Sequence, residues 1–174
     1  MEKATFAGGC FWCMQPPYDQ QAGVLSTEAG YMGGTTLDPT YEQVCSGTTG
    51  HAEVIQVTFD AEIVNYETLL EIFWKNIDPT TLNRQFADQG TQYRTAIFYH
   101  NESQHQQALA SKDRLQKTGK YSGPIVTEIA KASRFYPAEN YHQQYYKKNS
   151  LHYEMYKHGS GRAGYVKKMW GDQH

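Results

Sequence analysis

Long apolar runs are absent from this chain of 174 residues, and no segment approaches the roughly 20 apolar residues that span a membrane. The residues before the first predicted strand also lack an apolar segment of the signal-peptide type, so we expect a cytoplasmic protein. Cysteine is scarce as well, because the chain has 3 and none follows Cys45. An odd, small number argues against a secreted disulfide framework and favours free thiols.

Charge of either sign is sparse overall but unevenly placed. Charged residues make up 20% of the chain, hydrophobic residues 39%, and the net charge is −2, which is typical of a folded globular protein. Residues 1–60 hold seven acidic and one basic residue, whereas residues 112–168 hold twelve basic and four acidic ones. No Lys/Arg run exceeds two and no RNA-binding motif is present, so we interpret this excess as a solvated basic face rather than a nucleic-acid site.

The most informative stretch is Gly8-Gly9-Cys10-Phe11-Trp12-Cys13. A β-branched and aromatic run over residues 3–7 precedes it, which predicts a strand, a tight turn and a helix that begins near Cys10. Free backbone N–H groups and the helix dipole would favour a thiolate at Cys10 at neutral pH. Phe11 and Trp12 would supply an apolar wall, and Cys13, one turn away, is within disulfide reach.

Other interpretations of these cysteines stay open. Cys10 and Cys13 could be a buried structural pair, and together with Cys45 and His51 they form a set that could bind zinc, although the spacing fits zinc knuckles poorly. We expect Cys45 to be a small buried hydrophobe on a short helix. The same Cys-x-x-Cys could belong to a thioredoxin-like thiol–disulfide oxidoreductase, or the aromatic surface to a non-catalytic peptide-binding module.

Strand and helix patterns alternate along the rest of the chain without an internal repeat. Several connections are too short for parallel crossovers, so we expect one α+β domain over residues 1–174, a two-layer sandwich with a mixed, mainly antiparallel sheet flanked by helices. Pro16 and Pro17 should kink or interrupt the first helix. We expect further strands at 24–31, 53–59, 93–99 and 126–132. We expect one helix that begins after Asn65, one that runs from a Ser103 capping box to Thr118, and one over 138–148. The tail from about 150 to 174 is expected to be rich in loops.

Glu53 begins a strand rich in Val and Ile, and its environment decides its chemistry. If the side chain is buried and unpaired, its pKa rises and the neutral carboxyl becomes a proton donor. If the strand lies at a sheet edge, the carboxylate is simply solvated. The sequence leaves both open, and among 14 tyrosines it does not single out Tyr41 or Tyr93.

Six ordered motifs, spread over roughly residues 4–150, give the chain a specific family resemblance. It resembles the A-type peptide methionine sulfoxide reductases through Gly-Gly-Cys-Phe-Trp-Cys at 8–13, Gly-Tyr-Met-Gly-Gly at 30–34, Tyr-Glu-Gln-Val-Cys-Ser-Gly at 41–47, Thr-Gly-His-Ala-Glu-Val at 49–54, Gln-Phe-Ala-Asp-Gln-Gly-Thr-Gln-Tyr-Arg at 85–94 and Ala-Glu-Asn-Tyr-His-Gln-Gln-Tyr at 138–145. One departure is the tail, which lacks the recycling cysteines that many members carry there.

The resemblance implies an oxidoreductase that repairs oxidative damage by returning the S epimer of methionine sulfoxide, free or in proteins, to methionine. It implies that Cys10 is the nucleophile that becomes a sulfenic acid, and that Glu53 is the acid. The other roles implied are an S-methyl pocket lined by Phe11 and Trp12, hydrogen bonds from Tyr41 and Tyr93 to the sulfoxide oxygen, and support from Asp88.

We expect Cys13 to resolve the sulfenic acid as a disulfide, because Cys45 is the only other cysteine and residues i and i+3 at a helix start share a face. An external reductant that attacks Cys10 directly is the alternative. The resemblance implies thioredoxin or a similar thiol as reductant. We expect no cofactor, metal, nucleic acid or membrane partner, and a monomer.

Overall fold

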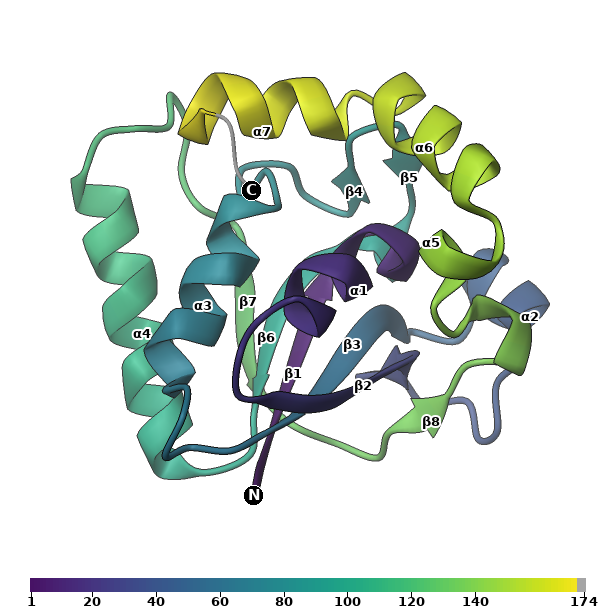
Figure 1. Ribbon diagram of the computed structural model, residues 1–174, viewed down its shortest axis with the longest axis horizontal. Helices are drawn as coiled ribbons and strands as arrows, with labels where there is room; N and C mark the ends of the chain where they lie inside the picture. Colours follow the sequence, from purple (N-terminus) through teal and green to yellow (C-terminus); the bar gives the residue numbers. More distant parts are fainter. Residues whose placement is uncertain (172–174) are drawn as a thin grey trace.

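The computed structural model describes residues 1–171, and a six-stranded sheet forms its centre. Its strands are β1 (Glu2–Gly8), β2 (Val24–Met32), β3 (Ala52–Phe59), β6 (Thr95–Tyr99), β7 (Glu128–Lys131) and β8 (Tyr136–Pro137). They lie in the order β7-β6-β1-β3-β2-β8 (Figure 1), with β6 and β7 parallel and the other neighbours antiparallel. The predicted mixed, mainly antiparallel sheet is therefore confirmed, and β3 lies inside the sheet rather than at its edge.

Helices connect and cover these strands. They are α1 (Phe11–Asp19), α2 (Tyr41–Cys45), α3 (Tyr66–Lys75), α4 (Glu102–Lys117), α5 (Tyr145–Lys148), α6 (Ser150–Gly159) and α7 (Arg162–Trp170), with 3₁₀ turns η1 (Thr91–Tyr93) and η2 (Asn140–His142) and a small hairpin, β4 (Arg84–Gln85) with β5 (Asp88–Gln89). Figure 1 shows α1 and α3 lying over the sheet, α4 beside α3, and α6 and α7 along one end. None of the helices within residues 1–171 has the length and apolarity needed to cross a membrane.

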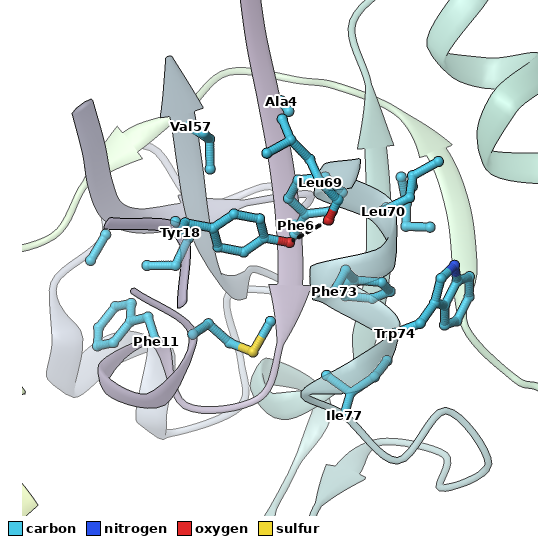
Figure 2. Packing of buried hydrophobic residues seen from close by; sticks show 14 of the residues in the cluster. Ala4, Phe6, Phe11, Tyr18, Val57, Leu69, Leu70, Phe73, Trp74 and Ile77 are labelled. Atoms are coloured by element: carbon cyan, nitrogen blue, oxygen red, sulfur yellow. Dashed lines mark hydrogen bonds between the residues drawn. The ribbon is translucent and has the colours of Figure 1, made fainter. Parts of the chain in front are cut away.

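The larger core lies between the sheet and helices α1, α3 and α4 (Figure 2). Phe6, at the centre of β1, stacks on Tyr18 of α1 at 5.3 Å and on Phe73 of α3 at 5.5 Å between ring centroids. The buried Tyr18 hydroxyl donates a hydrogen bond to the Leu69 carbonyl at 3.1 Å, so its polar end is satisfied. Burying each such ring contributes about 1.5–3 kcal/mol, and this packing anchors the first turn of α1 above the sheet.

Helix α1 runs through Pro16 and Pro17 to Asp19 without interruption, so of the predicted kink or interruption the interruption is absent. The prolines supply no N–H, so the carbonyls of Trp12 and Cys13 lack the usual partners four residues on. Met14 and Tyr18 on the buried face of α1 join the core, and this packing holds the helix in spite of the lost hydrogen bonds.

Two other helix boundaries differ from the predictions. Helix α4 is capped by Asn101, whose side chain accepts from the Gln104 N–H at 2.9 Å, and Ser103 lies inside the helix. The predicted helix over 138–148 is reduced to η2 and α5, because Gln144 adopts a left-handed conformation with φ of 48° between them.

The tail, predicted to be rich in loops, is instead helical over Ser150–Gly159 and Arg162–Trp170. Gly161, with φ of 92°, makes the left-handed turn between α6 and α7, so the tail glycines mark a junction rather than a long loop. Tyr153 is buried, and Arg162 reaches inward to donate to the carbonyls of Gly8 at 2.9 Å and Asn76 at 2.6 Å. Tertiary contacts therefore determine the structure of this segment.

Replacing Arg162 with Met is expected to lower the free energy of unfolding by about 1–3 kcal/mol, because it leaves two buried carbonyls without their charged donor. Urea unfolding of the two proteins measures the loss. Lys168→Met, an exposed site on the same helix, is the matched control and should unfold like the parent protein. Equal stability of Arg162→Met and the control would contradict this role for the guanidinium.

Candidate active site

The turn from β1 into α1 places Cys10 as predicted. Gly9 has φ of 86°, and a Cβ there would lie 2.7 Å from the side chain of Gln85, so only glycine fits this turn. Cys10 is the residue that caps α1, and its carbonyl accepts from the Cys13 N–H at 3.1 Å. The thiols of Cys10 and Cys13 are hydrogen-bonded to each other, and both residues are buried.

Glu53 faces this helix start from the interior of the sheet. It is 1% exposed, and its Oε1 accepts from the Phe11 N–H at 3.2 Å. Burial is the main reason that the pKa of this carboxyl rises to about 8, with smaller increases from Asp88 and Cys13 and an opposing decrease from the Phe11 hydrogen bond. Its Oε2 has no protein partner among the described residues. Of the two environments that the sequence allowed, the structure selects the buried, proton-bearing one.

The protonation of the cysteine pair differs from the expectation of a Cys10 thiolate. Burial raises the pKa of Cys10 well above its usual value, and the hydrogen bond with Cys13 and the proximity of Glu53 raise it further. The same hydrogen bond lowers the pKa of Cys13, as do the positive charges of Arg162 and Lys157. The effect of the helix N-terminus on the Cys10 pKa therefore does not outweigh that of burial, and Cys10 holds its proton more tightly than Cys13.

The two aromatic residues after Cys10 differ in their surroundings. Phe11 is buried, with its ring centroid 5.8 Å from that of Tyr31 and 5.0 Å from that of His142. Trp12 is partly exposed, stacks on Tyr145 at 3.9 Å, and donates from Nε1 to Nδ1 of His142 at 2.9 Å. Burial lowers the pKa of His142 to about 4, which keeps the ring neutral and able to accept this hydrogen bond. An aromatic surface thus lies beside the thiol.

Tyr41 and Tyr93 come together near Glu53 from α2 and η1. Burial raises the pKa of both phenols, and the charge of Glu53 is the next largest cause for each. Both hydroxyls also hydrogen-bond to Cys45. Cys45 is exposed, so the prediction that it is buried is wrong. The neighbouring Val44 takes the buried position on this short helix, so Cys45 points outward beside the phenols.

Asp88 lies in β5 and completes the set of predicted site residues. Burial raises its pKa, while a hydrogen bond from the Tyr156 hydroxyl and the charge of Arg162 act in the opposite direction. Asp88 in turn raises the pKa of Glu53 and of Cys10, which places it close to both. The structure therefore gathers Cys10, Cys13, Glu53, Asp88, Tyr41 and Tyr93 around one point.

Sequence reasoning missed the tail residues that border this point. Tyr156 donates to Asp88 and lies edge-on to Trp12 at 5.8 Å, and Tyr153 hydrogen-bonds the Cys13 thiol. Their spacing of three residues is typical of one helix face and was the available signal. His51, considered as a zinc ligand, instead accepts from the Gly34 N–H at 3.0 Å, with its other ring nitrogen 2.7 Å from the Thr36 carbonyl, and supports a loop.

A thiol, a neutral carboxyl and two phenols can together add sulfur to a polarised electrophile while protonating an oxygen atom. The thiol supplies the nucleophile, the carboxyl a transferable proton, and the phenols two hydrogen-bond donors. Cys13 offers a second sulfur in contact with the first. The arrangement suits a redox cycle that passes through a covalent change at Cys10 and a disulfide.

Comparison with known proteins agrees with this chemistry. The model of the family described as peptide methionine sulfoxide reductase matches residues 2–174. The chain is 57% identical over 170 residues to the peptide methionine sulfoxide reductase MsrA of Bacillus subtilis (strain 168), covering 98% of this chain and 96% of that protein. It is 56% identical to the MsrA of Bacillus pumilus (strain SAFR-032) over 172 residues, covering 99% of this chain and 97% of that protein.

A solved structure has a similar fold. The reduced form of Mxr1 from Saccharomyces cerevisiae superposes with a TM-score of 0.80 at 34% sequence identity and covers 86% of each chain. Most of this fold is thus shared with a protein whose sequence has diverged considerably.

Proposed function

Since this chain belongs to the peptide methionine sulfoxide reductase family, we propose that Cys10 attacks the sulfoxide sulfur while Glu53 protonates its oxygen. The protein is a thiol-dependent oxidoreductase that reduces methionine sulfoxide. The observation that carries the assignment of roles is Glu53 itself, a buried carboxyl with a pKa of about 8, bonded to the N–H of the residue that follows Cys10. A carboxyl that keeps its proton at neutral pH can donate that proton to the sulfoxide oxygen as the thiol attacks.

The first step balances without an outside reactant. A sulfoxide is polarised as S⁺–O⁻, so attack by the Cys10 sulfur forms a bond to the substrate sulfur while the sulfoxide oxygen gains the proton of Glu53. The proton lost by the thiol restores Glu53. The protonated oxygen then moves to the Cys10 sulfur: the substrate S–O bond and the bond between the two sulfurs break, methionine leaves as the thioether, and Cys10 is left as a sulfenic acid. Tyr41 and Tyr93 donate hydrogen bonds to the same oxygen, and Asp88 sustains the high pKa of Glu53.

Phe11 and Trp12 are proposed to receive the S-methyl group of the substrate. A methyl group next to sulfur packs well on aromatic rings, and each such contact contributes about 0.3–1.5 kcal/mol. Stacking on Tyr145 and the bond to His142 hold the Trp12 ring in place without substrate, which reduces the entropy lost on binding.

We propose that Cys13 closes the cycle. Its thiol condenses with the sulfenic acid, one water leaves, and a Cys10–Cys13 disulfide results. The existing hydrogen bond between the two thiols supports this choice, and so does the lowered pKa of Cys13, because the thiolate is the attacking form. Thioredoxin or a similar dithiol then returns the disulfide to two thiols.

The family and the residues support the remaining proposals. We propose a single catalytic domain that acts as a cytoplasmic monomer on the S epimer, whether the sulfoxide is free or part of a protein.

The decisive experiment adds each epimer of methionine sulfoxide separately to the reduced protein without other thiols. Mass spectrometry should show methionine release and loss of two thiols with the S epimer, while intact thiols with both epimers would favour a non-catalytic binding module.

Replacing Cys13 with Ser is expected to abolish thioredoxin-supported turnover while methionine release in a single turnover persists. The variant keeps the nucleophile and the acid but cannot form the disulfide that thioredoxin reduces. Mass spectrometry after one equivalent of sulfoxide should find a Cys10–Cys13 bridge in the parent protein and a sulfenic acid in the variant. A stable sulfenic acid in the parent, or a Cys10–Cys45 bridge, would refute the role of Cys13.

A further inference from the structure

A large cavity borders Cys13. It has a volume of about 630 Å³ and lies between α1, α3 and the tail helices α6 and α7. Cys13 is part of its wall, whereas Cys10, Glu53 and the two phenols do not line it within the described residues 1–171. The cavity therefore reaches Cys13 but not the residues assigned to the sulfoxide chemistry.

The cavity wall is strongly basic. Lys75, Lys157, Arg162 and Lys167 line it, together with one carboxylate, Glu71, which pairs with Lys75 at 3.0 Å. The hydrogen bonds of Arg162 go to two carbonyls and to the Met14 sulfur, and the carboxylate that its charge acts on, Asp88, does not line the cavity. The basic excess of residues 112–168, which the sequence suggested was only a solvated face, thus contributes to a defined concavity.

The wall also carries the groups that act on the Cys13 thiol. Tyr153 hydrogen-bonds this thiol, and Arg162 and Lys157 lie close enough to lower its pKa, and all three residues line the cavity. A molecule in the cavity would therefore meet the sulfur of Cys13 and positive charges together.

We propose that this cavity binds a low-molecular-weight thiol that carries carboxylates, and that such a thiol reduces the Cys10–Cys13 disulfide by attack on Cys13. The volume lies within the roughly 300–1,000 Å³ that small-molecule sites occupy, and the charge complements a carboxylate-bearing ligand. The inference rests on the resolving role proposed for Cys13.

The exchange is balanced. The thiolate of the first small thiol attacks the Cys13 sulfur and forms a mixed disulfide, while the Cys10 sulfur leaves as a thiolate and takes a proton from water. A second molecule of the small thiol attacks the bound one, releases a symmetric disulfide and frees Cys13. Two thiols are oxidised for each protein disulfide reduced, and the sulfoxide site stays clear of the reductant throughout.

The test compares glutathione with its diethyl ester, which has the same thiol without the carboxylates. The oxidised protein, prepared with one equivalent of methionine sulfoxide, is mixed with each thiol at low ionic strength, and thiol recovery is followed. We expect glutathione to react about tenfold faster than the ester, and salt to remove the difference. Lys157→Gln should lower the rate of disulfide reduction by glutathione about threefold to tenfold and leave the rate with the ester unchanged. The matched control Lys131→Gln on β7 should alter neither rate.

A second measurement identifies the protein sulfur that reacts with the small thiol. Cys10→Ser protein treated with oxidised glutathione should acquire one glutathionyl group on Cys13, because the Cys13 thiolate displaces one glutathione thiolate from it. Equal rates for glutathione and the ester, or a glutathionyl group on Cys45 alone, would overturn the proposal. So would a rate loss in Lys157→Gln confined to thioredoxin-supported turnover, since the cavity would then serve a protein reductant. Methionine release without any added thiol reports on the proposed function separately, so the two can fail independently.

Discussion

Cys10→Ser protein is expected to release no methionine from methionine sulfoxide, even with dithiothreitol as reductant. A serine hydroxyl does not ionise at this buried helix start, and oxygen cannot take up the sulfoxide oxygen as a sulfenic acid. Methionine formation in single-turnover and steady-state assays measures the effect.

The matched control is Cys13→Ser, which makes the same chemical change one turn along α1 and should keep single-turnover release. Thermal unfolding should show that both variants fold, since each replaces one buried thiol by a hydroxyl of similar size. More than trace activity in Cys10→Ser would show that another group is the nucleophile.

Glu53→Gln is expected to lower the rate of methionine formation by about 10²–10⁴-fold with little change in substrate affinity. The amide keeps the shape of the side chain and can still accept from the Phe11 N–H, but it has no proton to transfer. Single-turnover rates over a range of sulfoxide concentrations separate rate from affinity. A loss smaller than about threefold would make Glu53 structural and leave the acid role to Tyr41 and Tyr93.

The pH dependence gives an independent check on the same residue. The acid form of Glu53 is required, and with a pKa of about 8 this form is lost as pH rises through that value. The single-turnover rate of the parent protein should therefore fall above about pH 8, and this decline should be missing in Glu53→Gln. A decline that persists unchanged in the variant would have to come from another group.

The Glu53→Gln substitution should raise stability although it lowers activity. The pKa of Glu53 is higher in the folded protein than in the unfolded chain. The contribution of its neutral carboxyl to the free energy of unfolding is therefore fully present below about pH 4.5 and is lost as pH rises towards 8. Glutamine does not ionise, so Glu53→Gln should unfold at higher urea concentration than the parent protein near pH 8. A less stable variant would show that the carboxyl does not carry this cost of ionisation.

Several features of this protein were already determined by its sequence. The glycines before Cys10 predict the turn, because only residues without a Cβ tolerate its positive φ and close contacts. Periodic patterns predicted β3 and α3, since alternating apolar and polar residues mark a strand and an apolar face marks a helix, although β3 is in fact buried on both faces over Ala52–Ile55. The ordered motifs then indicated the family and the residues that would meet at the site.

The tertiary structure alone decided how those residues behave. Glu53 is a buried acid because β3 lies between β1 and β2, and Cys10 keeps its proton because segments distant in sequence exclude water from it. The helical tail is anchored to β1 by Arg162, which reaches the Gly8 carbonyl across 154 positions of the chain. Burial and pKa depend on neighbours brought together by folding, and no local pattern records them.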